Sequence, residues 1–307
     1  MAASSNPFAA TGTWLRCALH AHTTRSDGEL SPAELVALYE RAGFDVLAIT
    51  DHWVRTDAPS TERLLVIPSS ELSCLLPGEA DGHVLAFGID EDPLEFVRTR
   101  PDLADAAAWI GEHNGVAYLA HPYWTGTAAS SLSLGDGVAG IEVYNAGCEL
   151  EVGRGLSTVH WDELLERGTG CFGIAADDSH HAERDSGFAW VWTRVAERSA
   201  AAVLDALASG HFYSSTGPVL EELHVEEASV EVTCSPCSRV TLCTGRKRGT
   251  SVSSGPSGYR YGGEIVSVSD DGEITCVRLE RPPRSPYGRL ELVDRYGRKA
   301  WTNALWN

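Results

Sequence analysis

Three histidines near the start of the chain have the residue type and spacing of metal ligands. His20 and His22 are two residues apart after a short apolar run, so on a strand both imidazoles project from the same side. His52 follows a second apolar run, residues 44–50, which is typical of a buried parallel strand. Because the carboxyl ends of parallel strands meet at one edge of a sheet, we expect the three side chains to share a site.

The segment between these runs predicts the helix of a βαβ unit. Ser31 is a typical N-cap, Pro32 suits the first helical position, and Glu34 can complete a capping box. The helix is expected to end near Gly43.

Two further segments place a candidate ligand in a strand. Glu71 lies near the end of residues 63–72, where a carboxylate can bridge two cations, although such a residue is more often a solvated surface Glu. His83 opens residues 82–88 and, taken alone, reads as a satisfied core or edge histidine.

Two more apolar runs end in polar residues. His121 follows residues 116–120, and an Asp-x-His sequence, Asp178 and His180, follows residues 171–176. Their neighbours Asp177 and His181 point away from the site if the segment stays extended.

Three other polar residues are assigned less direct roles. Glu142 and Asn145 are expected to line the pocket without holding metal. His113 lies on a predicted helix, residues 102–113, out of position for a ligand, so it reads as structural.

These motifs, in this order, resemble those of the PHP (polymerase and histidinol phosphatase) superfamily of metal-dependent phosphoesterases. The resemblance rests on residues 20–28, 31–35 and 43–52 and on the later strand ends, and it spans about residues 14–195. It implies an α/β fold, a distorted (β/α)7-type barrel. The metal ligands it implies are His20, His22, Asp27, His52, Glu71, His83, His121, Asp178 and His180.

The resemblance also implies how the ligands would be shared among two or three divalent metal ions. In trinuclear members, one ion would take His20, His22, Glu71 and Asp178, a second would share Glu71 and add His83 and His121, and a third would use Asp27, His52 and His180. Nitrogen and oxygen ligands suit manganese, zinc or iron, and affinity order does not choose among them. Clustered ions can provide a metal-bridged hydroxide near neutral pH, so no serine or cysteine nucleophile is needed.

Arginines are the candidate groups for binding phosphate, because a planar guanidinium suits bidentate contact with phosphoryl oxygens. Arg25 lies inside the first motif and Arg184 just after the last. Either can equally be a surface charge.

Composition narrows the partners and the compartment. The formal charge is −19, which disfavours long nucleic acid, whereas bound cations still allow a small anionic substrate such as a phosphate ester. Eight scattered cysteines fit free thiols, and Cys234 and Cys237, despite their spacing, read as structural. With no apolar span and no recognisable leader, we expect a cytoplasmic protein without a membrane partner.

The pattern changes after about residue 210. We expect a flexible N-terminus at 1–13, the metal-binding barrel at 14–213 and a small β-sandwich-like domain at 214–307, with a mobile loop at 251–263. The tail resembles the carbaryl-hydrolase-like branch of the superfamily, whose Ala-Trp-x-Asn-Pro signature has Ala304 in place of the proline here.

Three functions are compatible with these observations. The first is a phosphoesterase that cleaves a nucleotide or sugar phosphate, including a cyclic one. The second is metal-dependent hydrolysis of a carbamate, ester or amide, and the third is a non-catalytic metal-binding module. Convergence of arginines on the site discriminates the first two. Substrate choice is expected to depend on the loops at 123–137 and 148–157, while the oligomeric state is left open.

Overall fold

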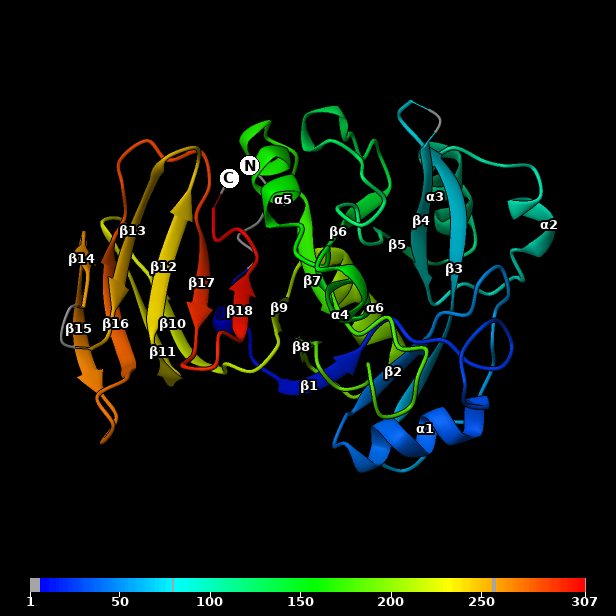
Figure 1. Cartoon of the computed structure of the whole chain (residues 1–307), viewed down its shortest axis with the longest axis horizontal. Helices are drawn as coiled ribbons and strands as arrows, with labels where there is room; N and C mark the ends of the chain where they lie inside the picture. The colour runs from blue at the N-terminus through cyan, green and yellow to red at the C-terminus, as the bar shows by residue number, and fades with distance from the viewer. Residues whose placement is uncertain (1–5, 79, 256–257, 307) are drawn as a thin grey trace.

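The computed structural model describes residues 6–78, 80–255 and 258–306, which form an α/β part and a β-rich part side by side (Figure 1). Within these residues, one curved sheet of fourteen strands runs through both parts, and a second sheet of four antiparallel strands covers its C-terminal end. The predicted α/β class with a β-rich tail is confirmed.

The α/β part follows the strand order β9-β8-β1-β2-β3-β4-β5-β6-β7. Its strands are β1 (Thr13–Ala18), β2 (Val46–Ile49), β3 (Leu65–Leu76), β4 (Ala80–Phe87), β5 (Val116–Leu119), β6 (Val138–Asn145), β7 (Phe172–Ala176), β8 (Trp190–Val195) and β9 (Phe212–Ser215).

This strand order is not a regular parallel repeat. β1, β2 and β3 are parallel, and so are β5, β6 and β7, but β4 is antiparallel to both β3 and β5. The link from β3 to β4 is too short for a crossover helix, so the two strands can only form a hairpin. The expected alternation of strand and helix is therefore interrupted at this hairpin.

The sheet curls so that its first and last strands approach each other. Ser214 on β9 donates a hydrogen bond from Oγ to the carbonyl oxygen of Gly173 on β7, at 2.8 Å. This contact brings the carboxyl ends of distant strands around one centre.

Helices cover the curved sheet. α1 begins as predicted, with Pro32 at its first position and a complete capping box between Ser31 and Glu34. α6 ends at Gly210, whose φ of 76° is the left-handed conformation that glycine tolerates. The helices are α1 (Pro32–Arg41), α2 (Leu94–Val97), α3 (Leu103–Glu112), α4 (Ala146–Val152), α5 (Thr158–Glu166) and α6 (Ala200–Ser209), with short 3-10 turns η1 (Pro7–Ala9) and η2 (Ala129–Ser131).

The β-rich part is a two-layered arrangement around its own core. One layer is β14-β13-β12-β17-β18, which continues into β9, and the other is β10-β11-β16-β15. Its strands are β10 (Leu220–Val225), β11 (Ser229–Cys237), β12 (Arg239–Thr244), β13 (Arg248–Ser253), β14 (Arg260–Tyr261), β15 (Gly263–Val268), β16 (Ile274–Glu280), β17 (Arg289–Val293) and β18 (Lys299–Thr302).

The segment expected to be a mobile loop, 251–263, contains regular structure. Its first residues belong to β13, where buried Val252 pairs with Val240, and Arg260 and Tyr261 form β14. The high serine and glycine content suggested a loop, but exposed strand positions also tolerate small polar residues, so the β13–β14 pair was not predicted. Residues 256–257 of the predicted loop lie outside the described residues.

The segment expected to be a flexible N-terminus, 1–13, is described from Asn6 onward. Phe8 in η1 packs against Trp14 and Tyr213, with ring centroids 4.9 and 6.0 Å apart. These aromatic contacts hold this stretch against β1 and β9. The domain boundary at 213 stays a prediction, since the main sheet passes through it without a break.

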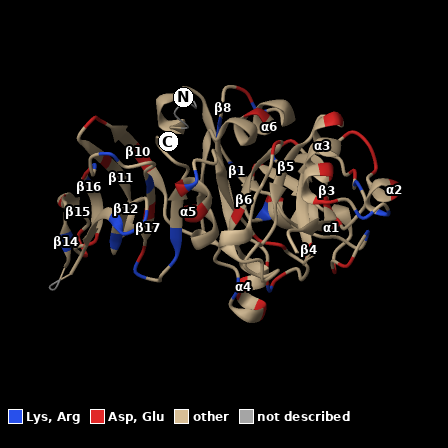
Figure 2. Ribbon diagram, turned by 90° about the horizontal axis from the view of Figure 1, so that it is seen from above, with Lys and Arg blue, Asp and Glu red and all other residues tan. Residues whose placement is uncertain are grey.

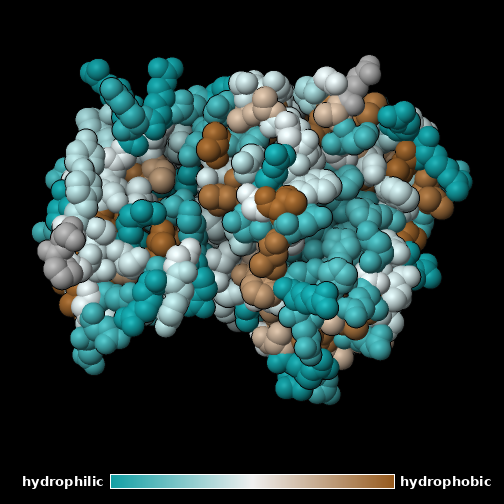
Figure 3. All heavy atoms as spheres, in the orientation of Figure 1, coloured by the Kyte–Doolittle hydropathy of each residue, from teal (hydrophilic) through white to brown (hydrophobic). Residues whose placement is uncertain are grey.

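Charge is distributed unevenly along the chain. Residues 214–307 carry 12 acidic and 12 basic side chains, so the whole formal charge of −19 falls within residues 1–213. Basic residues accordingly gather on the β-rich part in Figure 2. Hydrophobic residues emerge as separate patches among hydrophilic ones on the face shown in Figure 3.

Two expectations from composition can be compared with the structure. All eight cysteines are free thiols, and seven of them are buried. In the described part of the chain, no helix combines the length and the apolar character needed to cross a membrane.

Candidate metal centre

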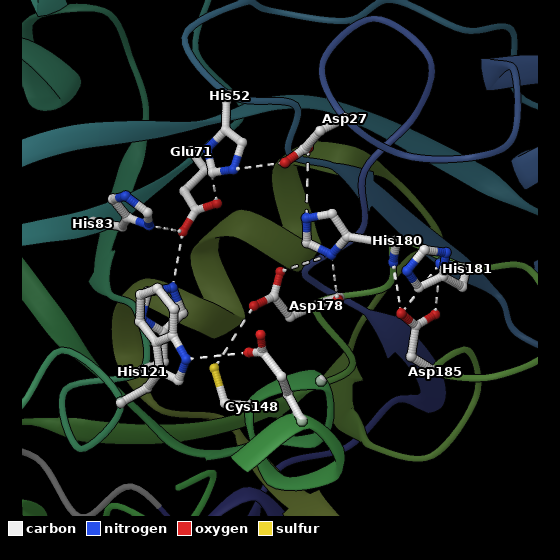
Figure 4. Close-up of a pocket in the computed structure, with 13 residues that line it drawn as sticks. Asp27, His52, Glu71, His83, His121, Cys148, Asp178, His180, His181 and Asp185 are labelled. Atoms are coloured by element: carbon white, nitrogen blue, oxygen red, sulfur yellow. Dashed lines mark hydrogen bonds and ion pairs between the residues drawn. The ribbon is translucent and has the colours of Figure 1, made fainter.

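The nine residues proposed as ligands converge at the carboxyl edge of the parallel strands. They are His20, His22 and Asp27 after β1, His52 after β2, Glu71 within β3, His83 within β4, His121 after β5, and Asp178 and His180 after β7. Figure 4 shows that these elements, far apart in sequence, face a common pocket.

Glu71 lies at the centre of the cluster. Its Oε1 is 2.8 Å from His83 Nδ1 and 3.1 Å from His121 Nε2, and its Oε2 is 3.2 Å from both His20 Nε2 and His52 Nδ1. In Figure 4 the side chains of His52, His83 and His121 surround it. A carboxylate with ligands on both oxygens is placed as a bridge between two cations.

Asp178 organises a second group of ligands. Its Oδ1 lies 3.1 Å from both His20 Nε2 and His22 Nε2, and those two nitrogens are 3.1 Å from each other. The alternation predicted for the His20–x–His22 strand end therefore directs both rings to one point.

Asp27 marks the outer side of the cluster. Its carboxylate oxygens lie 3.5 Å from His52 Nε2, 3.5 Å from His180 Nε2 and 3.6 Å from His22 Nδ1. Asp27 is the most exposed of these ligands, with 54% of its side chain accessible.

The spacing and chemistry of the cluster fit divalent metal ions. Two nitrogen or oxygen ligands bound at about 2.1 Å to one ion lie roughly 3.0–3.4 Å apart in tetrahedral or octahedral geometry. The distances around Glu71 and Asp178 match that spacing. In addition, His52 Nδ1 and His83 Nδ1 are buried and lie within ion-pair distance of Glu71 but without hydrogen-bond geometry, so both nitrogens are available to a cation held between them and the carboxylate.

The groups that could hold an ion agree with most of the shared arrangement implied by the resemblance. One group is His20, His22, Glu71 and Asp178, as implied. Another joins His22 to the implied set of Asp27, His52 and His180. The remaining group is His52, Glu71 and His83; His121 contacts the same Glu71 oxygen as His83 but is not part of that compact group.

Glu142 and Asn145 support the ligands from behind. Glu142 Oε1 lies 2.7 Å from His20 Nδ1, while its Oε2 accepts hydrogen bonds from the His121 backbone N–H and from Asn145 Nδ2. Asn145 Nδ2 also donates to Asp178 Oδ2 at 3.1 Å. Both residues are fully buried, so they orient ligands beneath the pocket surface.

Two buried carboxylates have roles that the sequence reasoning missed or underrated. Asp51 accepts hydrogen bonds from Thr23 N, Thr23 Oγ1, Ser26 Oγ and Thr56 Oγ1, which fixes the loop that carries His22 and Asp27. The position of Asp51 directly after a buried strand was a signal in the sequence, because an acidic residue that is buried there usually has a hydrogen-bonding partner.

Asp177 is the second such carboxylate. It accepts three backbone N–H bonds from residues 187–189 and one bond from the hydroxyl of Tyr39. It does point away from the ligands, as predicted, and burial raises its pKa to about 6 despite these hydrogen bonds. Its effect is to anchor the loop that follows His180.

Two ligands have backbone conformations that non-glycine residues rarely adopt. The φ of Asp178 is 55° and that of His121 is 27°. Local hydrogen bonds hold these conformations, including those from Asp178 N to His20 O and from His121 N to Glu142. Such strain is typical of functional sites, where the surrounding structure compensates for it.

Electrostatic coupling within the cluster is strong. Burial would lower the pKa of His22, but its hydrogen bonds and charge interactions with Asp178 and Glu71 outweigh burial and raise it to about 9. Burial would raise the pKa of Glu71, yet the histidines, His83 and His20 foremost, hold it well below its usual range. In the absence of metal, protons on His20 and His22, whose pKa values are raised, thus offset part of the carboxylate charge.

The cluster opens into a cavity of about 410 Å³, the size of a small-molecule site. Besides the candidate ligands, the cavity is lined by Trp124, which contacts His121, by Cys148, which lies near Asp178, and by Gly147, Glu151, His181 and Asp185. Arg25 and Arg184 are exposed and do not line the cavity, so their role in phosphate binding stays a prediction. Among the described residues that line it, there is no lysine or arginine.

Fold and site together define a mixed α/β protein with a candidate multinuclear metal centre at the carboxyl ends of its parallel strands. Among solved structures, a two-domain protein from Bacteroides vulgatus that contains a predicted PHP-like metal-dependent phosphoesterase is similar over 92% of this chain and 91% of its own, with a TM-score of 0.54 and 16% identity. This likeness shows that the two chains share an overall fold.

Two other solved structures are similar over a smaller share of the chain and with lower TM-scores. A provisionally assigned metal-dependent phosphoesterase from Bifidobacterium adolescentis matches 56% of this chain and 90% of its own, at 16% identity and a TM-score of 0.44. An amidohydrolase from Chromobacterium violaceum matches 56% and 89%, at 17% identity and a TM-score of 0.38. No family model matches the sequence, and no curated protein does.

Proposed function

We propose that this chain is a metal-dependent hydrolase of the PHP type that cleaves a small phosphate ester, such as a nucleotide or sugar phosphate. The observation that carries the proposal is the convergence of nine side chains with nitrogen or oxygen donors, Glu71 among them at the centre, at a cavity of small-molecule size. The proposal keeps the distorted (β/α)7-type barrel as a prediction; the contact between β7 and β9 supports closure of the curved sheet but not a strand number.

Two or three divalent ions, manganese, zinc or iron, would be held in this centre. Such ions, when bound, polarise a phosphoryl or carbonyl oxygen and lower the pKa of a water molecule. The protein contributes the fixed positions of its ligands: Glu142 orients His20, Asn145 orients Asp178, and Asp51 fixes the loop of His22 and Asp27. A small anionic substrate is compatible with this acidic part because bound cations would reverse the local charge.

A second candidate is the hydrolysis of a carbamate, ester or amide. The observation that favours it is the absence of lysine and arginine from the described cavity lining, because phosphoryl recognition often uses a guanidinium. The resemblance of the tail to the carbaryl-hydrolase-like branch points the same way and stays a prediction. A cytoplasmic location and the absence of nucleic-acid and membrane partners are likewise kept as predictions.

The deciding experiment is turnover of metal-loaded protein against two chromogenic panels, with metal content measured on the same sample. One panel contains aryl phosphates, including a bis-ester, and the other contains aryl esters and carbamates. Release from phosphates alone supports the phosphoesterase, and release from carboxyl or carbamoyl esters alone supports the second candidate. Metal-loaded protein that hydrolyses neither panel would contradict both and leave the non-catalytic module.

Phosphate could be recognised by an arginine or by the metal ions alone, and the variants Arg25→Ala and Arg184→Ala distinguish these two modes. If either arginine reaches the substrate, its removal raises KM for aryl phosphates and leaves aryl esters unaffected. If metal ions alone neutralise the phosphate, both variants keep the wild-type KM.

A further inference from the structure

The cavity lining beside the candidate metal ligands includes an aromatic ring and a carboxylate. Trp124 lies in the turn that follows His121, and Glu151 lies on α4, one helical turn after Cys148. Both fall in the two loop regions, 123–137 and 148–157, that the sequence assigned to substrate choice.

Trp124 is held in place although it is exposed. Its backbone N–H donates to His121 O at 3.0 Å, and its ring meets the His121 imidazole in a T-shaped arrangement with centroids 5.1 Å apart. Its Nε1 donates to Glu151 Oε2 at 3.3 Å. With 39% of the residue still accessible, the indole is a fixed aromatic surface beside a metal ligand.

An exposed indole with three such restraints loses little conformational freedom when a ligand binds. An aromatic ring that stacks on it would therefore gain contact area at a low entropic cost. Glu151 restrains the orientation of the Trp124 ring, because its carboxylate accepts the hydrogen bond from the indole N–H.

The rest of the lining has little that could recognise the organic part of a substrate. The described lining residues other than the ligands are Trp124, Gly147, Cys148, Glu151, His181 and Asp185. Trp124 supplies the largest apolar surface among them. Cys148 is a small neutral thiol at the base of the cavity, 4.0 Å from Asp178 Oδ2, and burial raises its pKa (Figure 4).

We propose that Trp124, positioned by Glu151, is the stacking surface for a planar aromatic ring in the substrate. The preferred substrates are then esters whose organic group carries such a ring, a nucleobase or an aryl group, and aliphatic esters are poorer. This inference rests on the proposed hydrolase function. It concerns the organic group of the substrate, not the bond that is cleaved.

Binding of matched aryl and alkyl ligands to metal-loaded protein tests the proposal without turnover. Calorimetry would compare phenylphosphonate with methylphosphonate, and benzoate with acetate, so that both phosphoryl and carboxyl groups are represented. We expect the wild-type protein to bind the aryl member of at least one pair about tenfold more tightly. Trp124→Ala should remove that preference, and Trp124→Phe should retain most of it.

Two further variants distinguish stacking from a general disturbance. Glu151→Gln keeps an acceptor for the indole N–H and should retain the aryl preference, whereas Glu151→Ala should weaken it. Tyr123→Ala is the matched control, because Tyr123 is a neighbouring aromatic residue with 43% exposure that does not line the cavity. The metal content of each variant is measured, and a wild-type value shows that its metal centre is intact.

The proposal is overturned if wild-type protein shows no aryl preference in either pair, if Trp124→Ala weakens aryl and alkyl ligands equally, or if Tyr123→Ala has the same effect as Trp124→Ala. Failure of the hydrolase proposal would give a different experimental result. Metal-loaded protein would then hydrolyse neither chromogenic panel while the Trp124-dependent aryl preference persisted.

Discussion

Glu142 holds His20 in the orientation that a metal ligand needs. The two side chains are fully buried, Glu142 Oε1 lies 2.7 Å from His20 Nδ1, and the opposite nitrogen, Nε2, faces Glu71 and Asp178. A carboxylate at Nδ1 fixes the ring and makes Nε2 more basic. The residues are 122 positions apart in the chain, so folding alone creates the pair.

Changing Glu142 should therefore weaken metal binding without removing a ligand. Glu142→Gln keeps the size of the side chain but removes its charge, and we expect metal affinity to fall about 10- to 100-fold. Titration with a metal-chelator competitor measures this. Wild-type affinity in the variant would show that His20 does not depend on Glu142.

Loss of a central ligand should abolish both metal binding and hydrolysis. We expect His20→Ala and Asp178→Ala to lower the bound metal measured by elemental analysis and to reduce turnover to background. His113→Ala is the control, because His113 caps α3, stacks on Trp109 and lies outside the cavity. Full metal content and turnover in both ligand variants would refute the site.

Metal affinity should rise with pH. A histidine must lose its proton to bind a metal, and His22 in the metal-free protein has a pKa raised to about 9 by Asp178 and Glu71 in spite of burial. Below pH 9 an ion that takes His22 as a ligand must displace that proton, so its affinity increases up to about pH 9 and then levels off. Calorimetry in buffers of different ionisation enthalpy should detect proton release at pH 7; no release would contradict the assignment of His22.

Asp51 should contribute to stability as well as to the shape of the site. It is fully buried and accepts four hydrogen bonds, so Asp51→Asn replaces an acceptor by a donor that faces other donors. We expect a loss of about 1–3 kcal/mol, because buried hydrogen-bonding groups are left unpaired. Chemical denaturation measures it, with exposed Asp57→Asn as a control that should change little.

Asn303 should link the C-terminal segment to the α/β part. Its Oδ1 accepts from Gly173 N on β7, and its Nδ2 donates to the carbonyl oxygens of Gly210 and Phe212. Asn303→Ala leaves these buried backbone groups unpaired, and we expect a cost of about 1–3 kcal/mol. An unchanged denaturation midpoint would show that water replaces the amide.

The same contacts explain part of the terminal signature. Trp301 is fully buried and stacks on Tyr144 of β6, and Asn303 is 1% exposed and binds the backbone of β7. Both residues therefore join the C-terminal segment to the α/β part. Ala304, in place of the proline, is also buried. The tail thus has a structural role whatever the subfamily of the enzyme.

Most of the candidate ligands were predictable from the sequence because they lie in or next to a short apolar strand. Strand alternation placed His20 and His22 on one side, and the capping box located the start of α1 within one residue. These are local effects, decided by a few consecutive residues. Asp27 was predicted only from the resemblance to the PHP superfamily, which rests on the order of the motifs.

Only the tertiary structure decided the relationships between distant segments. The β3–β4 hairpin interrupts the parallel order, Glu142 and Asn145 reach ligands on other strands, and Arg25 and Arg184 stay outside the cavity lining. Asp178 has a left-handed backbone conformation that no local pattern announces. Local periodicity determines which residues reach the edge of a sheet, whereas long-range packing determines which of them meet and which buried groups support them.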